Sequence, residues 1–490
     1  MLSLNVTGLH GNISYYYYIC IIYVCSFTGY IGHYLKEFRT MSTYKYSLYD
    51  YHAIKSAEIE IPGITVISGV NGSGKSTLSK WLFYLVNEST HFNLHVVSAF
   101  LSCIIEKIRR VDMIRRDIRV FSEHLGMYDS SRLMFDTLRK IRNIDESNVE
   151  AMDIASDIYF SYLDKFIPQL QFYLEHAKGG ARRERIVESL DVEIKDDKDL
   201  SSIVHIFSEM NRKEIEDMKE SYLQIIEKRP LSNFFYNIQS IYHEDDEVPK
   251  HIQLKENGVQ LLNVNKHVAS ELYYLERAIY IDTPMSISMN ESGNFFWSDL
   301  MHLMMSEERS DSIETKKMLH RIRNIIKGQA KVEKDAWGSN ELHFVSTDGL
   351  DIKLEKAATG FKTFAYLQRL VENGHVNGKT LLLIDEPEAH LHPQWIVEFA
   401  HILVLLHKNL GLKLMIASHN PDMVSAISAI AQKEGIDDKV RFYLSTQDKE
   451  TNKYVFKNLG NDISEIFISF NIALDRINQY GNTDKAGILE

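Results

Sequence analysis

The chain has 490 residues, of which 44% are hydrophobic and 25% are charged, and its formal net charge at pH 7 is −12. The length predicts two or three domains, and the ordinary composition excludes a disordered chain, a collagen and a polytopic membrane protein. The acidic balance disfavours wholesale coating of nucleic acid. Three cysteines cannot build a disulfide framework, which favours a cytoplasmic protein. They are Cys20, Cys25 and Cys103.

The first 40 residues differ from the rest of the chain. Residues 1–35 contain no Asp, Glu, Lys or Arg, and residues 13–31 form an uncharged run near the length that spans a bilayer. A membrane anchor, a signal peptide without a basic n-region and a non-native extension before Met41 are all open interpretations. We favour the extension, because the tyrosine-rich run suits an interface better than a membrane interior. No membrane contact is expected unless residues 13–31 are native.

A phosphate-binding loop follows the first predicted strands. Residues 44–51 and 57–61 show strand-like alternation, and residues 63–68 read as a short buried strand. The chain then runs into the segment Gly69–Thr77, which fills the pattern G-x-x-x-x-G-K-[ST] of a Walker A motif. Residues 77–87 are predicted to continue as a helix. The order of strand, loop and helix is the context that this motif requires.

The residue types in this loop suit the binding of ATP with Mg²⁺. The glycines allow backbone N–H groups to curl around phosphate oxygens, and the helix directs its N-terminus at the anion. Lys75 can reach the outer phosphates, and the Ser76 hydroxyl is placed to bind Mg²⁺. The predicted nucleotide-binding residues of the loop are Gly69, Asn71, Gly72, Ser73, Gly74, Lys75, Ser76 and Thr77.

Two apolar segments far downstream end in polar residues. Residues 380–386 read as a buried parallel strand that ends in Asp385 and Glu386, at the end of a strand where ligands bind. Asp385 suits a Walker B role toward Mg²⁺, and Glu386 can act as general base toward water. A second such strand, residues 414–418, is followed by His419, which can meet the terminal phosphate. The predicted catalytic residues are Glu386, His419 and Lys75, and the predicted metal ligands are Ser76 and Asp385.

A weaker signal precedes the Walker B strand. A hairpin is predicted over residues 342–354, followed by a helix over residues 361–372 that Thr359 caps. The pair Thr359-Gly360 exposes the helix N-terminus, which is an anion-binding surface. A plain capped helix is the alternative interpretation.

Together these segments resemble ABC-type ATPases in the SMC-like and OLD-like (overcoming lysogenization defect) branch of the AAA family. The chain order matches the family's order of Walker A, signature, Walker B and switch histidine. Residues 385–393 look like this branch's Walker B and D-loop region, and residues 418–422 are similar to its switch segment. The resemblance implies an α/β fold: a P-loop NTPase head of ABC type, with a mixed, largely parallel sheet and a large helical insertion.

The resemblance also implies partners and further site residues. Members of this branch form head-to-tail dimers, so we expect a homodimer or higher oligomer with two ATP molecules at the interface. Thr359 and Gly360 would form a degenerate signature that contacts the partner's ATP, with Lys362 supplying charge. A Q-loop glutamine is not securely identified, and Gln169 and Gln171 are the candidates. His390 and His392 have metal-like spacing and could form a zinc site with Glu388, but the resemblance assigns them to the family's structural segment.

A large insertion separates the two halves of the predicted site. Roughly 310 residues lie between Lys75 and Asp385, far more than a bare cassette needs. The sequence lacks sustained heptads and a Cys-x-x-Cys hook, so long coiled-coil arms are not expected. Helices are predicted over 99–125, 130–146, 150–178 and 203–228, a hairpin over 251–262 and a core strand over 278–284. The predicted domains are an extension (1–40), the N-terminal half of the ATPase (41–100), a helical insertion (101–275) and the C-terminal half (276–490).

Three basic stretches have two open interpretations, a salt-bridged helix face or a track for DNA phosphates. The acidic charge of the chain favours the first. The stretches comprise Lys107, Arg109, Arg110, Arg115, Arg116 and Arg119; Arg182, Arg183 and Arg185; and a predicted helix carrying Lys316, Lys317, Arg321, Arg323, Lys327, Lys331 and Lys334.

The end of the chain bears on its biological role. A closing hairpin is predicted over residues 439–457, followed by a helix over 463–479, and the rest is too short for the Toprim nuclease domain of long OLD-like proteins. By the resemblance we expect an ATP-hydrolysing sensor or scaffold subunit of an anti-phage defence system, with a separate effector nuclease as protein partner. The alternative is an SMC-like ATPase of DNA repair or chromosome maintenance that binds DNA directly. The large insertion and atypical signature disfavour a transporter subunit.

Overall fold

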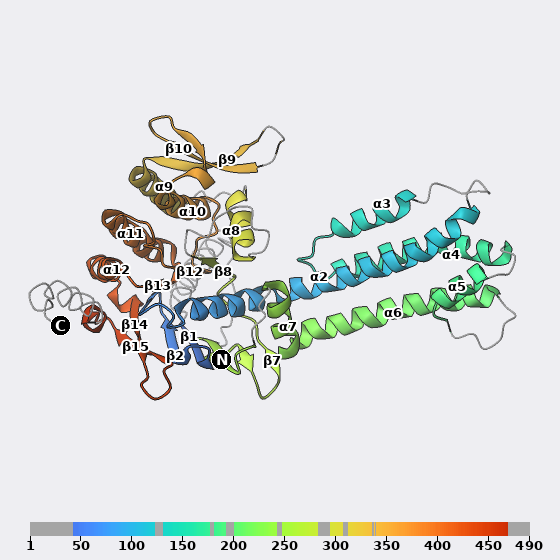
Figure 1. The fold of residues 1–490 in the computed structure, drawn as a ribbon, viewed down its shortest axis with the longest axis horizontal. Coiled ribbons are helices and arrows are strands. Elements are labelled where there is room, and N and C mark those ends of the chain that lie inside the picture. The colour runs from blue at the N-terminus through green and yellow to red at the C-terminus, as the bar shows by residue number, and fades with distance from the viewer. Residues whose placement is uncertain are drawn as a thin grey trace, which may run out of the picture. The chain divides into compact units, whose positions relative to one another are not determined.

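The structure, a computed structural model, describes residues 43–122, 131–176, 181–192, 200–242, 247–282, 295–306, 312–335, 338 and 340–468. The predicted extension over residues 1–40 and the predicted start at Met41 lie outside these residues. The chain forms two compact units (Figure 1). The sheet unit is drawn from Met1–Val86, Glu247–Leu261 and Leu272–Glu490, and the helical unit from Asn87–Asp246 and Leu262–Glu271. The predicted boundaries at residues 100 and 275 stay predictions.

A ten-stranded mixed sheet organises the sheet unit, in the order β5-β4-β1-β2-β15-β14-β3-β13-β12-β8. Strands β8, β12, β13, β3 and β14 are mutually parallel. Beyond them β15 pairs antiparallel with β14 and parallel with β2, and β2, β1, β4 and β5 follow as antiparallel neighbours. This architecture confirms the predicted α/β class. The strands are β1 (Tyr44–Tyr51), β2 (Ile54–Ile61), β3 (Ile64–Ser68), β4 (His251–Glu256), β5 (Val259–Gln260), β8 (Arg277–Ile281), β12 (Thr380–Asp385), β13 (Lys413–Ser418), β14 (Val440–Gln447) and β15 (Tyr454–Gly460).

The central strands read as apolar runs because both of their faces are covered. Every residue of β3, β12 and β13 is buried, as expected of parallel strands between helix layers. Their register aligns Ser418 with Ser68 and Asp385 with Ala417. The three strands therefore end at one edge of the sheet. The loops that carry the predicted ATP site leave from that edge.

Five of the helices and a small sheet belong to the described part of the sheet unit. Residues Phe364 of α10 and Phe399 of α11 pack edge to face, with ring centroids 5.2 Å apart, in a continuous apolar core. The helices are α8 (Phe295–Met305), α9 (Ile313–Ile326), α10 (Thr359–Glu372), α11 (Pro393–Leu410) and α12 (Pro421–Glu434). The small sheet has the order β11-β10-β9, with β9 (Gly328–Lys334), β10 (Asn340–Ser346) and β11 (Asp351–Lys353).

Two predictions in this region are wrong. The helix expected to carry Lys316 to Lys334 ends at Ile326, because Lys327 takes a left-handed conformation (φ 47°) and the next residues pair with β10. Lys331 and Lys334 therefore lie on a strand. Thr359 does not cap α10 but is its first residue, and the N-cap is Ala358, which makes no side-chain capping bond.

Long helices dominate the helical unit (Figure 1). In its interior Phe166 of α4 packs against Phe207 of α6, and the Tyr159 hydroxyl bonds to Asn211 Oδ1 at 2.7 Å. The helices are α2 (Lys75–Ser122), α3 (Ser131–Arg142), α4 (Ala151–His176), α5 (Ala181–Ser189), α6 (Leu200–Lys228) and α7 (Leu231–Tyr242), with a small hairpin of β6 (Leu262–Asn263) and β7 (Val268–Ala269).

One helix boundary in this part of the chain is also wrong. The helices predicted over residues 77–87 and 99–125 are a single helix, α2, whose first turns belong to the sheet unit. Residues 88–98 continue the helical spacing of buried residues, with Phe92, Val96 and Val97 all in the core. Within the described residues, no helix is both long and apolar enough to cross a bilayer.

Candidate nucleotide-binding site

The Walker A loop curls tightly between β3 and α2. Gly72 and Gly74 have φ angles of 77° and 94°, which only glycine adopts readily. Gly69 lies against β14, so that a Cβ atom there would come within 1.7 Å of Ser445 Oγ. The loop encloses the head of Lys75, whose Nζ donates hydrogen bonds of 3.0 Å to the carbonyl oxygens of Gly69 and Val70. This conformation brings the backbone of the loop and the Lys75 ammonium close together, as phosphate-binding loops require.

The Walker B carboxylate is buried at the end of β12. Tyr280, on the neighbouring strand β8, donates its hydroxyl to Asp385 Oδ2 at 2.8 Å. Asp385 is 1% exposed, and its Oδ1 accepts no hydrogen bond from the described residues. Burial raises the pKa of Asp385, and the nearby hydroxyls of Ser76, Tyr280 and Ser79 oppose that rise.

These groups fit a magnesium ion. Ser76 offers a hydroxyl and Asp385 a carboxylate oxygen that is buried yet unused, and hard oxygen donors of this kind are what Mg²⁺ prefers. The local charge points the same way. Burial lowers the pKa of Lys75, while the carboxylates of Glu386, Asp385 and Glu388 act in the opposite direction. One lysine facing three acids leaves room for a further cation.

Glu386 and His419 meet just beyond the sheet edge. Glu386 has a φ of 47°, a sparsely populated conformation for a non-glycine residue, and its N–H donates to Ala417 O at 2.8 Å. The half-exposed ring of His419 places Nδ1 3.4 Å from Glu386 Oε1. The structure thus brings the three predicted catalytic residues to the carboxyl ends of adjacent parallel strands.

Glu388 is a residue of this site that the sequence did not assign to it. Its Oε1 accepts hydrogen bonds from Ser418 Oγ at 2.7 Å and from the His419 backbone N–H at 3.0 Å. The sequence pattern indicated Glu388 only as a possible zinc ligand beside His390 and His392. In the structure His392 instead caps α11, and His390 is exposed. The only sequence signal for its place in this site is that Glu388 lies three residues after Asp385.

The predicted signature residues lie together at the start of α10. Gly360 is buried, and a Cβ atom there would be 3.0 Å from the Trp395 ring, so the close packing favours a small residue. Thr359 and Lys362 are partly exposed in the same helical turn. Their contact with the ATP of a partner subunit stays a prediction. Gln169 and Gln171 lie on α4 in the helical unit, where each bonds within its own helix.

Five basic residues of α2 are paired with acids. Arg110 lies 3.7 Å from Asp191, Arg115 bonds to Asp112 at 2.6 Å and Arg116 to Asp112 at 2.7 Å. Lys107 pairs with Glu214, and Arg109 with Glu106. These contacts favour the salt-bridged interpretation of this stretch. The side chains of Arg119 and Arg182 lie outside the described residues.

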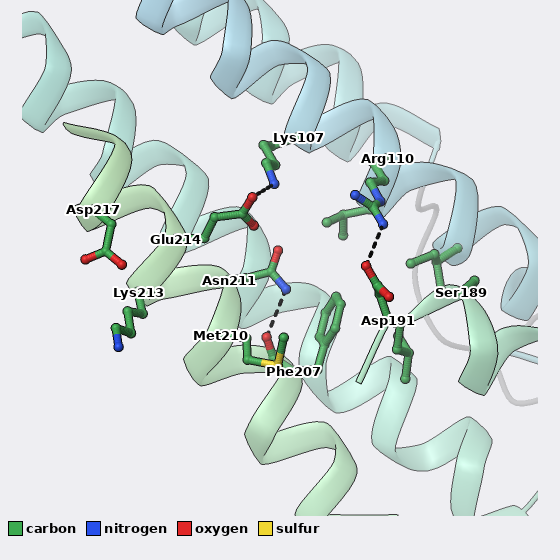
Figure 2. Close-up of a pocket in the computed structure, with 13 residues that line it drawn as sticks. Lys107, Arg110, Ser189, Asp191, Phe207, Met210, Asn211, Lys213, Glu214 and Asp217 are labelled. Carbon is green, nitrogen blue, oxygen red and sulfur yellow. Dashed lines mark hydrogen bonds and ion pairs between the residues drawn. The ribbon is translucent and has the colours of Figure 1, made fainter. Parts of the chain in front are cut away.

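A cavity of about 400 Å³ opens beside these pairs in the helical unit (Figure 2). Three basic residues that line it are matched by three acidic ones, so the cavity presents no net positive charge to a phosphate group. The charged lining residues are Lys107, Arg110, Lys213, Asp191, Glu214 and Asp217.

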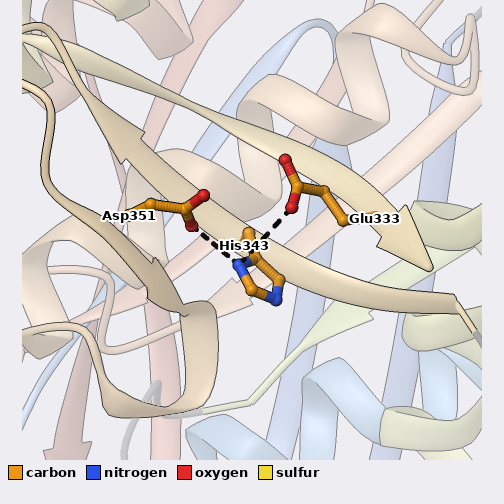
Figure 3. A group of neighbouring side chains, drawn as sticks. All are labelled: Glu333, His343 and Asp351. Carbon is orange, nitrogen blue, oxygen red and sulfur yellow. Dashed lines mark hydrogen bonds and ion pairs between the residues drawn. The ribbon is translucent and has the colours of Figure 1, made fainter. Parts of the chain in front are cut away.

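A histidine and two acids cluster on the small sheet, away from the Walker motifs in sequence (Figure 3). His343 Nδ1 lies 2.7 Å from Asp351 Oδ1 and 3.9 Å from Glu333 Oε2. The hydrogen bond with Asp351 raises the pKa of His343, and the charges of Asp351 and Glu333 and a hydrogen bond with Glu341 act in the same direction. The cluster is therefore accounted for as a network of hydrogen bonds and ion pairs around the imidazole.

The fold and the site define a P-loop ATPase domain, with a Walker A loop and a Walker B strand on one edge of a parallel sheet core. Residues 45–424 match the AAA ATPase domain family. The chain belongs to this family of AAA ATPase domains. Its members bind ATP with Mg²⁺, in keeping with the donor groups described above.

Solved structures of SMC head domains are distantly similar to the chain. The head domain from Thermotoga maritima is 11% identical, with a TM-score of 0.26, over 43% of this chain and 65% of that one. The head domain with an extended coiled coil from Pyrococcus furiosus, bound to the C-terminal domain of ScpA, is 11% identical with a TM-score of 0.31, over 88% and 100%. The head domain with a coiled coil and joint from Pyrococcus yayanosii is 9% identical with a TM-score of 0.34, over 88% and 100%.

Proposed function

We propose that this chain binds ATP and hydrolyses it to ADP and phosphate. The observation that carries the proposal is the convergence of Lys75, Asp385, Glu386 and His419 at the ends of adjacent strands β3, β12 and β13. A lysine in a glycine-rich loop, a buried carboxylate and a more exposed acid one residue later are the groups that phosphoryl transfer to water requires.

Each residue has a role that follows from its position. The loop amides and Lys75 hold the phosphates, with the ammonium exchanging its loop carbonyl partners for phosphate oxygens. Ser76 and Asp385 would hold Mg²⁺, which neutralises phosphate charge when bound. Glu386 takes a proton from the attacking water as the bond to the leaving ADP oxygen breaks. His419, beside Glu386, contacts the terminal phosphate.

The proposed assembly and biological role rest on the family resemblance. Two subunits would enclose two ATP molecules, with Thr359, Gly360 and Lys362 of each reaching the ATP of the other. ATP binding would close the dimer and hydrolysis would open it. We propose a cytoplasmic OLD-like sensor or scaffold of anti-phage defence that passes this change to a separate effector nuclease.

The alternative, an SMC-like repair or chromosome-maintenance ATPase that binds DNA directly, receives less support from the geometry. Its proposed contact helix carries Arg321 and Arg323, but Arg321 bonds to His401 and Arg323 lies 3.3 Å from Glu372. Paired cations contribute less to a phosphate track than free ones. Stimulation of ATP turnover by DNA, lost on neutralising Lys316 and Lys317, would favour this alternative.

The test of the proposed hydrolysis is Glu386→Gln. We expect turnover to fall by about 100-fold or more, because the amide cannot accept the proton, while ATP is still bound. The trapped nucleotide would also raise the dimer fraction on size-exclusion chromatography. Glu450→Gln, in the exposed turn between β14 and β15, is the matched control. Unchanged phosphate release by Glu386→Gln would reject the assignment of the base.

A further inference from the structure

We propose that Glu388 is a positioning residue that fixes His419 relative to Glu386, and that ATP turnover depends on it. This inference rests on the proposed hydrolysis of ATP. It adds to that proposal a residue that acts through the segment that follows β13.

The position of Glu388 follows from a tight turn after β12. The N–H of Ala389 donates to Glu386 O at 2.9 Å, and the N–H of Leu391 donates to Glu388 O at 3.0 Å. His390 in the same turn has a φ of 62°. This turn folds the Glu388 side chain back toward the end of β13 instead of letting it follow the strand direction into solvent.

Glu388 supplies the tie between the two strand ends beyond the sheet ladder. The last backbone bond between them runs from the Glu386 N–H to Ala417 O at 2.8 Å. Ser418, the last residue of β13, and His419, which follows it, donate to Glu388 Oε1 at 2.7 and 3.0 Å. His419 Nδ1 is also 3.5 Å from that oxygen, and 3.4 Å from Glu386 Oε1. Both the backbone and the ring of His419 are thereby in contact with acids of the Walker B segment.

The tie continues into the next helix. Ser418 Oγ, while donating to Glu388, accepts the N–H of Asn420 at 3.1 Å. Asn420 in turn caps α12 by accepting from the N–H of Asp422 at 2.7 Å. His419 therefore lies between two anchored residues, which fix the position of its backbone relative to Glu386.

The burial of Glu388 argues that this arrangement is retained for more than packing. The side chain is 3% exposed, and its Oε2 has no hydrogen-bond partner among the described residues. Burial raises the pKa of this carboxyl, as expected for an acid removed from water. An acid in this position costs stability that an apolar residue of similar size would not. Its Oε1 atom instead accepts the Ser418 hydroxyl and the His419 N–H, two donors that need an acceptor at this place.

Substitutions at this position separate a positioning role from plain packing. Glu388→Ala removes the acceptor and leaves the Ser418 hydroxyl and the His419 N–H unpaired. Glu388→Gln keeps an Oε1 atom that can accept both bonds, while it removes the charge. A positioning role predicts that alanine impairs turnover and glutamine restores it.

The experiment compares steady-state ATP hydrolysis, binding of a fluorescent ATP analogue and thermal unfolding in the wild type, Glu388→Ala, Glu388→Gln and Ser418→Ala. We expect Glu388→Ala to lower kcat by about 10- to 100-fold, the loss that a small misplacement of a reacting group causes, with KM within about threefold. Glu388→Gln should recover most of kcat. Ser418→Ala, which removes one of the two bonds, should lie between them and serves if Glu388→Ala does not fold.

Four outcomes overturn the inference. The first two are wild-type kcat in both Glu388→Ala and Ser418→Ala, and a loss of ATP binding that matches the loss of kcat. The other two are a kcat in Glu388→Gln as low as in Glu388→Ala, and a wild type that does not hydrolyse ATP. The last outcome rejects the proposed function itself, whereas the others leave the hydrolysis by the wild type intact and reject only the role of Glu388.

Discussion

His419 Nδ1 and Glu386 Oε1 lie 3.4 Å apart, although the two residues follow different strands. The parallel register of β12 and β13 places both strand ends at the same level, and the left-handed backbone of Glu386 turns its side chain toward the imidazole. The proposed general base and the proposed partner of the terminal phosphate are thus neighbours. A substitution of one side chain is therefore expected to alter the environment of the other.

This contact leads to a prediction for His419→Ala. We expect kcat for ATP hydrolysis to fall by about 10- to 1,000-fold, because the terminal phosphate loses a partner and Glu386 loses its neighbour. ATP affinity should change by less than about threefold, since the loop and Lys75 hold the other phosphates. Phosphate release and nucleotide titration measure the two effects. His251→Gln, exposed on β4, is the control, and equal losses of kcat and affinity would contradict the prediction.

A second prediction concerns the packing of Gly69 against Ser445. A Cβ atom at Gly69 would lie 1.7 Å from Ser445 Oγ and 2.8 Å from Ser445 Cβ, so Gly69→Ala must displace the loop or β14. Strain of about 1–3 kcal/mol would weaken ATP binding by roughly 5- to 150-fold.

The contact between a Cβ atom at position 69 and Ser445 can be removed without changing the loop. Ser445→Gly removes both of the contacted side-chain atoms, so the double variant should bind ATP more tightly than Gly69→Ala alone. Ser445→Gly by itself should bind ATP nearly as the wild type does. A double variant no better than Gly69→Ala would show that the backbone conformation, and not the contact with Ser445, makes glycine necessary here.

The strands that carry the site could be predicted because their sequence pattern has one physical cause. Parallel strands covered on both faces are continuous apolar runs, so residues 380–385 and 414–418 were identifiable without structural information. The Walker A loop was identifiable for a similar reason, since Gly72 and Gly74 adopt backbone angles that other residues avoid.

The remaining features depend on contacts between distant residues. The end of α9 is set by Lys327 and by the pairing of β9 with β10, which the charge pattern of Lys316 to Lys334 does not reveal. The proposed role of Glu388 depends on a turn that folds its side chain back onto Ser418. The two residues are 30 positions apart in the chain. Helical spacing continues through residues 88–98, but a short polar stretch hid the continuity of α2.

A third prediction compares two buried tyrosines. Tyr280 donates its hydroxyl to Asp385 Oδ2 at 2.8 Å, whereas the buried hydroxyl of Tyr366 has no partner among the described residues. Tyr280→Phe should lower the free energy of unfolding by about 1.5–3 kcal/mol, the usual contribution of a hydrogen bond to a charged group. Tyr366→Phe is the matched control and should be neutral or slightly stabilising. Urea denaturation measures both, and equal effects would contradict the assignment of the Tyr280 bond.

The last prediction concerns the pH dependence of the small sheet. Asp351 lies 2.7 Å from His343, Glu333 and Glu341 face the same ring, and Lys331 and Lys353 are its cross-strand neighbours. The pKa of His343 is raised in the folded chain, mainly by the bond to Asp351. The folded state therefore holds this proton more tightly than the unfolded state does. The resulting stabilisation is fully present below the unfolded pKa of about 6.5 and is lost as the pH rises through the folded pKa.

A double-mutant cycle with His343→Gln and Asp351→Asn isolates this contribution. Near pH 5.5 the coupling between the two side chains should be about 0.2–1 kcal/mol, the range for a partly exposed ion pair, and near pH 9 it should be smaller. Urea denaturation of the four proteins at each pH gives the coupling. The ion pair also weakens in about 1 M salt, whereas an uncharged hydrogen bond does not. A coupling that is equal at both pH values would mean that His343 is neutral throughout, and that Asp351 holds it by a hydrogen bond alone.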